Sequence, residues 1–197
     1  MIRGVIFDLD GTLVDSRLDF DAMRLEMELP PDQPILESLA RLEPLHAARC
    51  HEILHRHELE GADRALLLPG VRELVAALHV RGIHQAVATR NSRRITETTL
   101  SKLDLPFDLV LTRDEGPVKP DAWAVHESAR RWSVATAEIV VVGDHRFDVE
   151  CGRAAGSRTV LLTHPGDPRT YANTEQADLV LASLAEHEVL LDFLEAL

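Results

Sequence analysis

The segment FDLDGT places two carboxylates, Asp8 and Asp10, close together at the end of a short apolar run. Gly11 begins a turn, so Asp10 can swing toward the pocket that Asp8 faces. Two crowded carboxylates either raise a pKa or require a cation. The same residues also fit a capped turn, in which Asp10 or Thr12 bonds local amides.

Three further segments carry polar side chains near the end of an apolar run or in the loop that follows one. Thr89 closes AVAT, and the helix expected after Asn91 offers free amides to an anion. Asp144 and Asp148 flank the turn in GDHRFD, a placement that suits an oxygen-preferring cation such as Mg²⁺, although Asp148 also fits a helix start. Lys119 lies in the loop GPVKPD, where a lysine is usually solvated. Each signal is weak by itself.

Short apolar runs alternate with helical patterns along most of the chain. The patterns predict strands at about 5–9, 86–89, 109–112, 138–144, 159–162 and 179–182, and helices at about 70–81, 92–103, 121–132, 147–155 and 184–197. Near-continuous apolar strands alternating with helices predict a doubly wound, Rossmann-like parallel α/β sheet. Sites in such sheets lie beyond the carboxyl ends of the strands, so every strand end is a candidate for chemistry.

Residues 19–68 break this alternation, because they contain helical patterns and proline-rich turns but no strand-like run. We interpret them as a helical insertion after the first strand, with residues 1–18 and 69–197 forming the α/β domain. The insertion, roughly fifty residues long, is below the usual size of an independent domain.

Composition limits the classes of function. The chain has 33 acidic and 21 basic residues and a formal net charge of −12, which argues against nucleic acid or an anionic membrane as a partner. Its two cysteines exclude a disulfide framework, and the N-terminal segment lacks the pattern of a signal peptide. No apolar window is long enough to span a bilayer. We therefore expect a soluble, cytoplasmic protein.

Taken together, the motifs resemble those of the haloacid dehalogenase (HAD) superfamily. The first motif, DxDGT, matches Asp8–Thr12, the hydroxyl motif matches Thr89, the lysine motif matches Lys119–Pro120, and GDxxxD matches Gly143–Asp148. The combination is specific, although no single motif is. The chain is most similar to the phosphoglycolate phosphatase-like subfamily, in which a small helical insertion is a C1-type cap that closes over the active site.

The resemblance implies a two-step reaction on Asp8. Asp8 would attack phosphorus in line and form an aspartyl-phosphate. Asp10 would protonate the leaving oxygen and then deprotonate the water that hydrolyses the intermediate. Mg²⁺ would be held by Asp8, by the backbone carbonyl of Asp10 and by Asp144, and would neutralise the charge between nucleophile and substrate.

The resemblance also implies a binding site for the phosphoryl oxygens. Thr89, the backbone amide of Arg90 and the ammonium of Lys119 would bind them. Asp148 would orient Lys119 or a metal-bound water. Many relatives have Asn or Gly directly after the hydroxyl residue, whereas Arg90 stands there in this chain, so its side chain can add a contact of its own.

These assignments predict a Mg²⁺-dependent phosphatase of a small phosphorylated metabolite, either a monomer or a weak homodimer. Asp10 favours phosphate chemistry over displacement of halide from carbon. A phosphomutase similar to β-phosphoglucomutase has the same aspartates and is the alternative, but it would need a larger cap to shield the phosphoenzyme from water. A catalytically idle binding protein is disfavoured, because every expected catalytic position is filled.

One motif lies outside this scheme. HEILH at residues 51–55 matches the HExxH pattern of zinc proteases. The extended pattern fails, because Glu58 stands where glycine is required and Gly61 where the last histidine is required. We interpret HEILH as a solvated face of a helix in the insertion, with substrate contact, adventitious metal or catalytic zinc as lesser alternatives.

Overall fold

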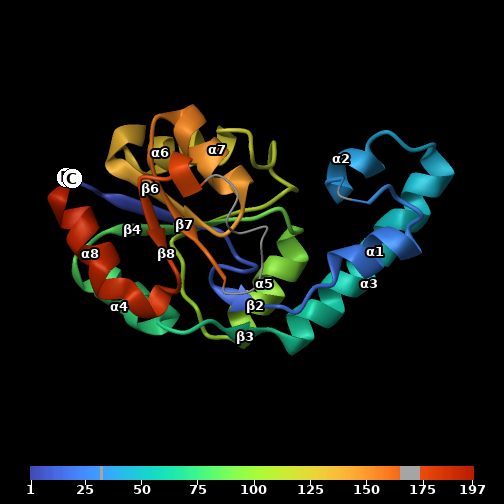
Figure 1. Cartoon of the computed structure of the whole chain (residues 1–197), viewed down its shortest axis with the longest axis horizontal. Helices are drawn as coiled ribbons and strands as arrows, with labels where there is room; N and C mark the ends of the chain where they lie inside the picture. The colour runs from blue at the N-terminus through green and yellow to red at the C-terminus, as the bar shows by residue number, and fades with distance from the viewer. Residues whose placement is uncertain (32, 165–173) are drawn as a thin grey trace. The chain divides into compact units, whose positions relative to one another are not determined.

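The computed structural model describes residues 1–31, 33–164 and 174–197, and the chain divides into two compact units (Figure 1). The α/β unit comprises Met1–Asp15 and Leu66–Leu197, and the helical unit comprises Ser16–Ala65. The predicted insertion, 19–68, differs from this division at both ends: residues 16–18 belong to the helical unit, and Leu66–Leu67 form the short strand β3 of the α/β unit. Strand β3 pairs antiparallel with β2 (Val14–Asp15), so the two connections to the helical unit leave from neighbouring strands.

The α/β unit contains a parallel sheet of six strands among the described residues. The strands are β1 (Gly4–Phe7), β4 (His84–Ala88), β5 (Leu109–Leu111), β6 (Ile139–Gly143), β7 (Arg158–Leu162) and β8 (Leu179–Leu181). Their order in the sheet is β5-β4-β1-β6-β7-β8. Every residue of β1 and β6 is buried, because helices cover both faces of the sheet. The predicted doubly wound α/β class is confirmed.

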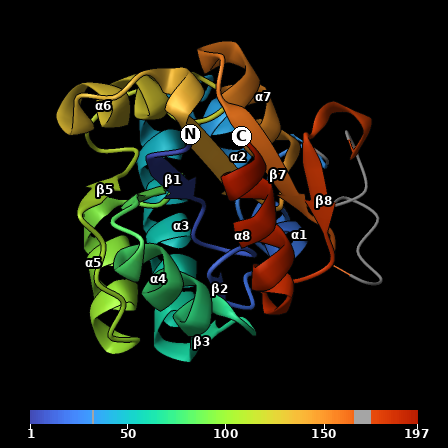
Figure 2. The ribbon, with the colours of Figure 1, turned by 90° about the vertical axis from the view of Figure 1, so that its left-hand side faces the viewer.

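Two groups of helices cover the sheet. They are α4 (Val71–Val80), α5 (Arg93–Lys102), α6 (Trp123–Trp132), α7 (Arg146–Ala155) and α8 (His187–Ala196), with short 3₁₀ turns at Thr136–Glu138, Thr174–Gln176 and Leu184–Glu186. Helices α6 and α7 cover one face, and α4, α5 and α8 cover the other (Figures 1 and 2). Alternate residues of each strand therefore face different helices. On the α6–α7 face, Ile6, Ala86 and Val141 pack with Val125 of α6 and Cys151 of α7.

The strand order places a topological switch point beside β1. From β1 the chain moves outward through β4 to β5 and then crosses to β6 on the other side of β1. Phe7 pairs with Val87 of β4 on one side and with Val142 of β6 on the other. Ligands bind at such a reversal, outside the carboxyl ends of the strands. The residues that follow β1, β4 and β6 are those that carry the first, second and acidic motifs.

The helical unit contains α1 (Phe20–Glu26), α2 (Ile35–Leu39) and α3 (Pro44–Arg64). Its own core consists of buried residues from these helices and the turn after α1: Met23, Met27, Leu29, Ile35, Leu39, Cys50 and Leu54. HEILH lies in α3, where His51 and Glu52 are exposed while Leu54 belongs to that core. Within the described residues, no helix has the length and apolar character needed to cross a bilayer.

Candidate active site

Lys119 reaches from the β5–α6 loop to carboxylates that follow two different strands. Its Nζ lies 2.6 Å from Oδ1 of Asp8, just beyond β1, and 2.6 Å from Oδ1 of Asp148, in the first turn of α7. The Lys119 side chain is only 5% exposed. Burial alone would lower the pKa of Lys119, but the charges of Asp148 and Asp8 outweigh it and raise that pKa, so the ammonium stays charged.

Asp148 makes one contact at the start of α7, as its place in the sequence allowed, and a second contact with Lys119. Its Oδ2 accepts a hydrogen bond from the backbone N–H of His145 at 3.1 Å, which caps the start of α7, while its Oδ1 binds Lys119. The close approach requires a glycine before it, because a Cβ on Gly143 would lie 2.1 Å from Cγ of Asp148. Asp148 therefore pairs with the Lys119 ammonium while its other oxygen is bound at the helix start.

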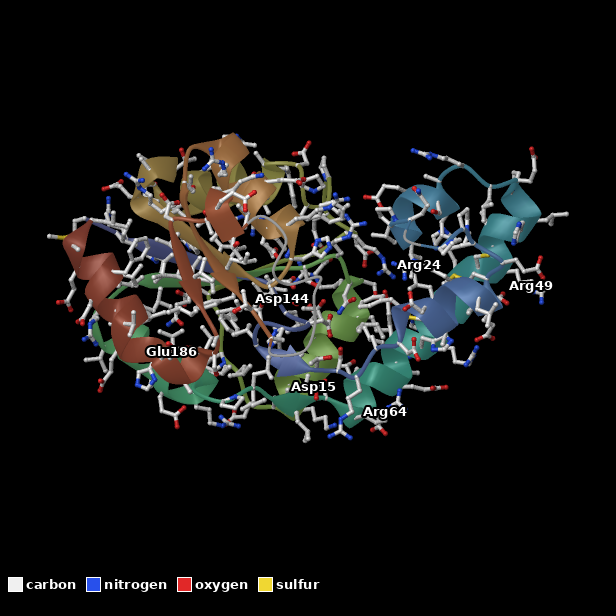
Figure 3. The ribbon with its side chains drawn as sticks, viewed as in Figure 1. Asp15, Arg24, Arg49, Arg64, Asp144 and Glu186 are labelled. Carbon is white, nitrogen blue, oxygen red and sulfur yellow. The ribbon has the colours of Figure 1, made fainter. Side chains whose placement is uncertain are left out.

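Asp144 completes a cluster of three carboxylates with Asp8 and Asp148, whose ligand oxygens all lie within 4.8 Å of one another. Figure 3 shows the Asp144 side chain at the carboxyl ends of the strands. Its Oδ1 accepts a hydrogen bond of 3.3 Å from the hydroxyl of Thr12, and the first-motif turn packs so tightly that a Cβ on Gly11 would lie 2.2 Å from Oδ2. The cluster is therefore built into the turn.

The cluster carries more negative charge than Lys119 offsets. Burial raises the pKa of Asp8, although Lys119 opposes the shift. The pKa of Asp144 is raised well above its ordinary value, by burial first and then by the charges of Asp8 and Asp148. Hard oxygen donors that repel one another in a partly buried pocket fit a divalent cation such as Mg²⁺, which would relieve this repulsion.

Asp10 points its carboxylate to a partner that sequence reasoning did not assign. The side-chain amide of Asn91 donates from Nδ2 to Oδ2 of Asp10 over 2.6 Å. The backbone N–H of Asn91 also donates to Oγ1 of Thr89, at 3.1 Å. The acid of the first motif is thereby linked to the hydroxyl of the second. The only feature of the sequence that could have indicated this contact was the position of Asn91, two residues after Thr89.

The Arg90 side chain connects three segments of the site. Its Nη1 donates to the backbone carbonyl of Lys119, and its guanidinium carbon lies 4.9 Å from the ring centroid of Phe147 in α7. Nη1 of Arg113 in turn donates to the carbonyl of Arg90 at 3.0 Å. Arg90 thus ties the tip of β4 to the lysine loop and to α7, which its position after Thr89 did not indicate.

His164, just beyond β7, was also missed by sequence reasoning. Its Nε2 lies 2.5 Å from the carbonyl oxygen of Gly11 and 3.9 Å from Oδ2 of Asp144. A ring N–H donated to that carbonyl supports the turn that presents Asp10 and Thr12. No motif surrounds His164, so only its place at a strand end could have indicated it.

HEILH does not form a second candidate metal site. Within the described part of the chain, Asp8, Asp144 and Asp148 are the one group of three or more acidic, histidine or cysteine side chains whose ligand atoms lie close enough to hold a metal. The nearby His57 instead contacts Glu26 through Nε2 at 2.8 Å. The zinc-protease alternative therefore lacks a third ligand in the described residues.

Comparison with known proteins places the chain in a family. The family model described as haloacid dehalogenase-like hydrolase matches residues 26–162. The chain belongs to the haloacid dehalogenase-like hydrolase family. It is 30% identical over 177 residues to a haloacid dehalogenase-like hydrolase domain-containing protein of Arabidopsis thaliana, a match that covers 84% of this chain and 72% of that protein.

Further relatives within the HAD family include a named phosphatase and a solved structure with the same fold. The chain is 30% identical over 214 residues to a phosphoglycolate phosphatase of Chromobacterium violaceum, with 94% of both chains covered. A hydrolase from Pseudomonas syringae superposes with a TM-score of 0.79 at 21% identity, covering 97% of this chain and 98% of that one, which shows the shared fold. The resemblance to the phosphoglycolate phosphatase-like subfamily is confirmed, and these matches support a phosphatase enzyme.

Proposed function

We propose that this HAD hydrolase is a Mg²⁺-dependent phosphatase that hydrolyses a small phosphate monoester through an aspartyl-phosphate on Asp8. The contact that carries the proposal is the 2.6 Å approach of the buried Lys119 ammonium to Asp8. This contact supports the proposal, because it joins a buried cation that would bind phosphate to the carboxylate that would act as nucleophile, in a chain whose net charge is −12. The relative named phosphoglycolate phosphatase makes phosphorylated hydroxy acids the first substrates to test.

Asp8, Asp144 and the backbone carbonyl of Asp10 would hold the metal. When bound, Mg²⁺ would reduce the repulsion between the anionic nucleophile and the anionic ester. The pKa of Asp144 is raised by burial first and then by the charges of Asp8 and Asp148, and the second cause supports this assignment, because a bound cation would offset those charges. Asp148 is engaged by Lys119 and by the N–H of His145, which favours an orienting role over direct ligation.

The residues of the chain would then share the steps of the reaction. A carboxylate oxygen of Asp8 attacks phosphorus, the P–O ester bond breaks, and Asp10 gives its proton to the leaving oxygen. Asp10, now a carboxylate, takes a proton from water as that water attacks the aspartyl-phosphate, which releases phosphate and restores Asp8. Throughout, the ammonium of Lys119 would bind phosphoryl oxygens.

Thr89 and the backbone amide of Arg90 would complete the phosphoryl site. Because Oγ1 of Thr89 already accepts the N–H of Asn91, its own O–H hydrogen can be donated to a phosphoryl oxygen. The tight link between the Arg90 side chain and the Lys119 carbonyl supports a fixed spacing between these two anion-binding segments. Fixed donors at the point where charge develops are the main source of electrostatic catalysis.

The helical unit Ser16–Ala65 would act as the cap. Its insertion between β2 and β3, directly after the first motif, supports this role. Such a cap excludes water during transfer and contacts the leaving group. Its small size favours hydrolysis over the phosphomutase alternative.

The test is phosphate release from a panel of phosphorylated metabolites, with Mg²⁺ or with EDTA, by the native chain and by Asp8→Asn. We expect release only with the native chain and Mg²⁺, because the side-chain amide of the variant cannot form the acyl phosphate. Native rates from Asp8→Asn would overturn the mechanism. Isomerised product without free phosphate would instead establish the phosphomutase.

A further inference from the structure

We propose that Asn91 is a positioning residue that holds the Asp10 carboxylate for proton transfer. The observation is the 2.6 Å hydrogen bond from Nδ2 of Asn91 to Oδ2 of Asp10, which joins residues 81 positions apart in the chain. The inference rests on the proposed function, since it requires Asp10 to act as general acid and base. It adds a residue that none of the four motifs contains.

Asn91 is fixed at both ends of its own backbone. Its N–H donates to Oγ1 of Thr89 at 3.1 Å, and its carbonyl accepts the N–H of Arg113 at 3.2 Å. The residue is 9% exposed, so the surrounding atoms also limit its side-chain rotamers. An amide held in this way offers its donor at one place only.

The backbone of Asp10 is fixed as well, which leaves side-chain rotation as its main freedom. The N–H of Gly11 donates to the carbonyl of Val14 at 2.8 Å, and Gly11 has a φ of +83° that a residue with a Cβ rarely adopts. Loss of the Asn91 side chain would remove this 2.6 Å hydrogen bond and with it one restraint on the side-chain torsions of Asp10. The hydrogen bond selects one orientation for it.

The same bond favours one oxygen as the carrier of the proton. In a neutral carboxylic acid the carbonyl oxygen accepts a hydrogen bond better than the O–H oxygen does, so the N–H of Asn91 on Oδ2 favours the proton on Oδ1. In the first step the ester P–O bond breaks, its electron pair stays on the leaving oxygen, and that oxygen takes the proton from Oδ1. In the second step Oδ1 accepts a proton from the attacking water. Asn91 gains and loses none.

This role can be tested by comparing esters that differ in their need for an acid. The p-nitrophenolate anion leaves without protonation, whereas the alkoxide of an alkyl ester such as phosphoglycolate needs a proton as it leaves. General acid catalysis contributes about 10²–10⁴-fold, so misplacing the acid in Asn91→Ala should lower kcat/KM for phosphoglycolate at least roughly tenfold. For p-nitrophenyl phosphate we expect kcat/KM to change by less than about threefold. This constant reports only the steps up to departure of the phenolate, and that departure needs no acid.

Two further variants serve as the positive and the negative control for this measurement. Asp10→Asn should show the same selective loss in a stronger form, which checks the role of Asp10 itself. Ser92→Ala is the matched control, because the Ser92 hydroxyl is adjacent, buried and without a hydrogen-bond partner in the described residues. We expect Ser92→Ala to keep the native ratio of the two rates.

A second readout follows the dephosphorylation step. If Asp10 is misplaced as a base, hydrolysis of the aspartyl-phosphate becomes rate-limiting in Asn91→Ala, and a burst of p-nitrophenol should precede the steady rate. Asn91→Leu, which is close to asparagine in size and removes the donor without adding a charge beside Asp10, should behave in the same way, so a folding defect of the alanine variant would not decide the question.

The proposal would be overturned if a folded Asn91 variant lost equal activity on both esters, or lost none on either. The proposed function would still stand in that case, provided that Asp10→Asn showed the selective loss on phosphoglycolate. If Asp10→Asn itself lacked the selective loss, the general-acid role would be wrong, and with it both the proposed mechanism and the inference.

Discussion

Asp144→Asn should make the metal-free protein more stable and at the same time remove its response to Mg²⁺. In the native chain the Asp144 carboxylate lies within 4.8 Å of oxygens of Asp8 and Asp148, and its side chain is only 19% exposed. An asparagine has the same shape, fits against Gly11, and can still accept the hydroxyl hydrogen bond of Thr12 through its amide oxygen. The substitution therefore removes mainly charge.

The size of the gain follows from Coulomb's law. Two like charges 4.8 Å apart at an effective dielectric constant of about 20 repel by about 3.5 kcal/mol. The Lys119 ammonium offsets part of this repulsion, so we expect a net gain of about 1–3 kcal/mol in the free energy of unfolding at neutral pH. For a chain of this size that gain corresponds to a rise of roughly 2–12 °C in Tm.

The gain should depend on pH in a defined direction. The folded-state pKa of Asp144 is raised above the ordinary 3.8, so the folded protein holds this proton more tightly than the unfolded chain does. The native protein thus carries no penalty below pH 3.8, and the penalty grows as pH rises through the raised folded-state pKa. Asp144→Asn should match the native stability in acid and exceed it at neutral pH.

The assay is urea unfolding of both proteins in EDTA across this pH range, followed by Tm measurements with added Mg²⁺. The native Tm should rise with Mg²⁺ concentration as expected for a ligand that binds the folded state, and the variant Tm should not. Asp178→Asn is the matched control, because the folded-state pKa of Asp178 is shifted in the opposite direction. Burial would raise the pKa of Asp178, but hydrogen bonds from Arg158 and Thr159 lower it overall.

Stability contributed by Asp178 is therefore present above pH 3.8 and lost as pH falls through its lowered folded-state pKa. Its asparagine variant should be less stable than the native protein at neutral pH, with the Mg²⁺ response intact. A metal-free Asp144→Asn protein that is less stable than native at neutral pH, or that keeps the full Mg²⁺ response, would refute the electrostatic reasoning.

The remaining predictions concern the turn and the helical unit. Gly11→Ala should destabilise the chain by roughly 1–3 kcal/mol, because it forces a Cβ onto a residue with a positive φ. It should also weaken Mg²⁺-dependent activity, because that Cβ meets Asp144. Calorimetry measures the first effect and phosphate release the second, and a fully active variant would contradict the geometry. The double variant His51→Ala, His55→Ala should retain native phosphate release and bind no less zinc than the native chain, as measured by equilibrium dialysis, since these side chains form no metal cluster in the described structure.

Much of the fold could be predicted from hydrophobic pattern, because each element buries its own residues. Val140–Val142 read as a strand buried on both faces, and Val71, Leu74, Val75 and Leu78 as the buried side of α4, which they are. The boundary of the insertion was less accurate. Leu66–Leu67 became a strand because β2 was available to pair with them, and a two-residue pairing leaves no periodic signal.

The approach of Lys119 to Asp8 was inferable from chain order and motif identity. The residues beyond β1 and β6, and those in the loop after β5, come to one edge in any parallel sheet of this connectivity. The sequence by itself therefore determined the fold class, which depends on hydrophobic pattern, and its motifs determined which of the motif side chains gather at the strand ends, since that depends on motif identity and on the direction of the strands.

Only the tertiary structure decided how those side chains are paired. Asn91 meets Asp10, Arg90 meets the Lys119 carbonyl, and His164 meets the carbonyl of Gly11. Each pair joins loops that follow different strands, and such loops have no periodicity from which a contact could be read. The orientation of their side chains depends on the packing of the whole strand edge, because a hydrogen bond forms only where both backbones already hold its two partners within reach.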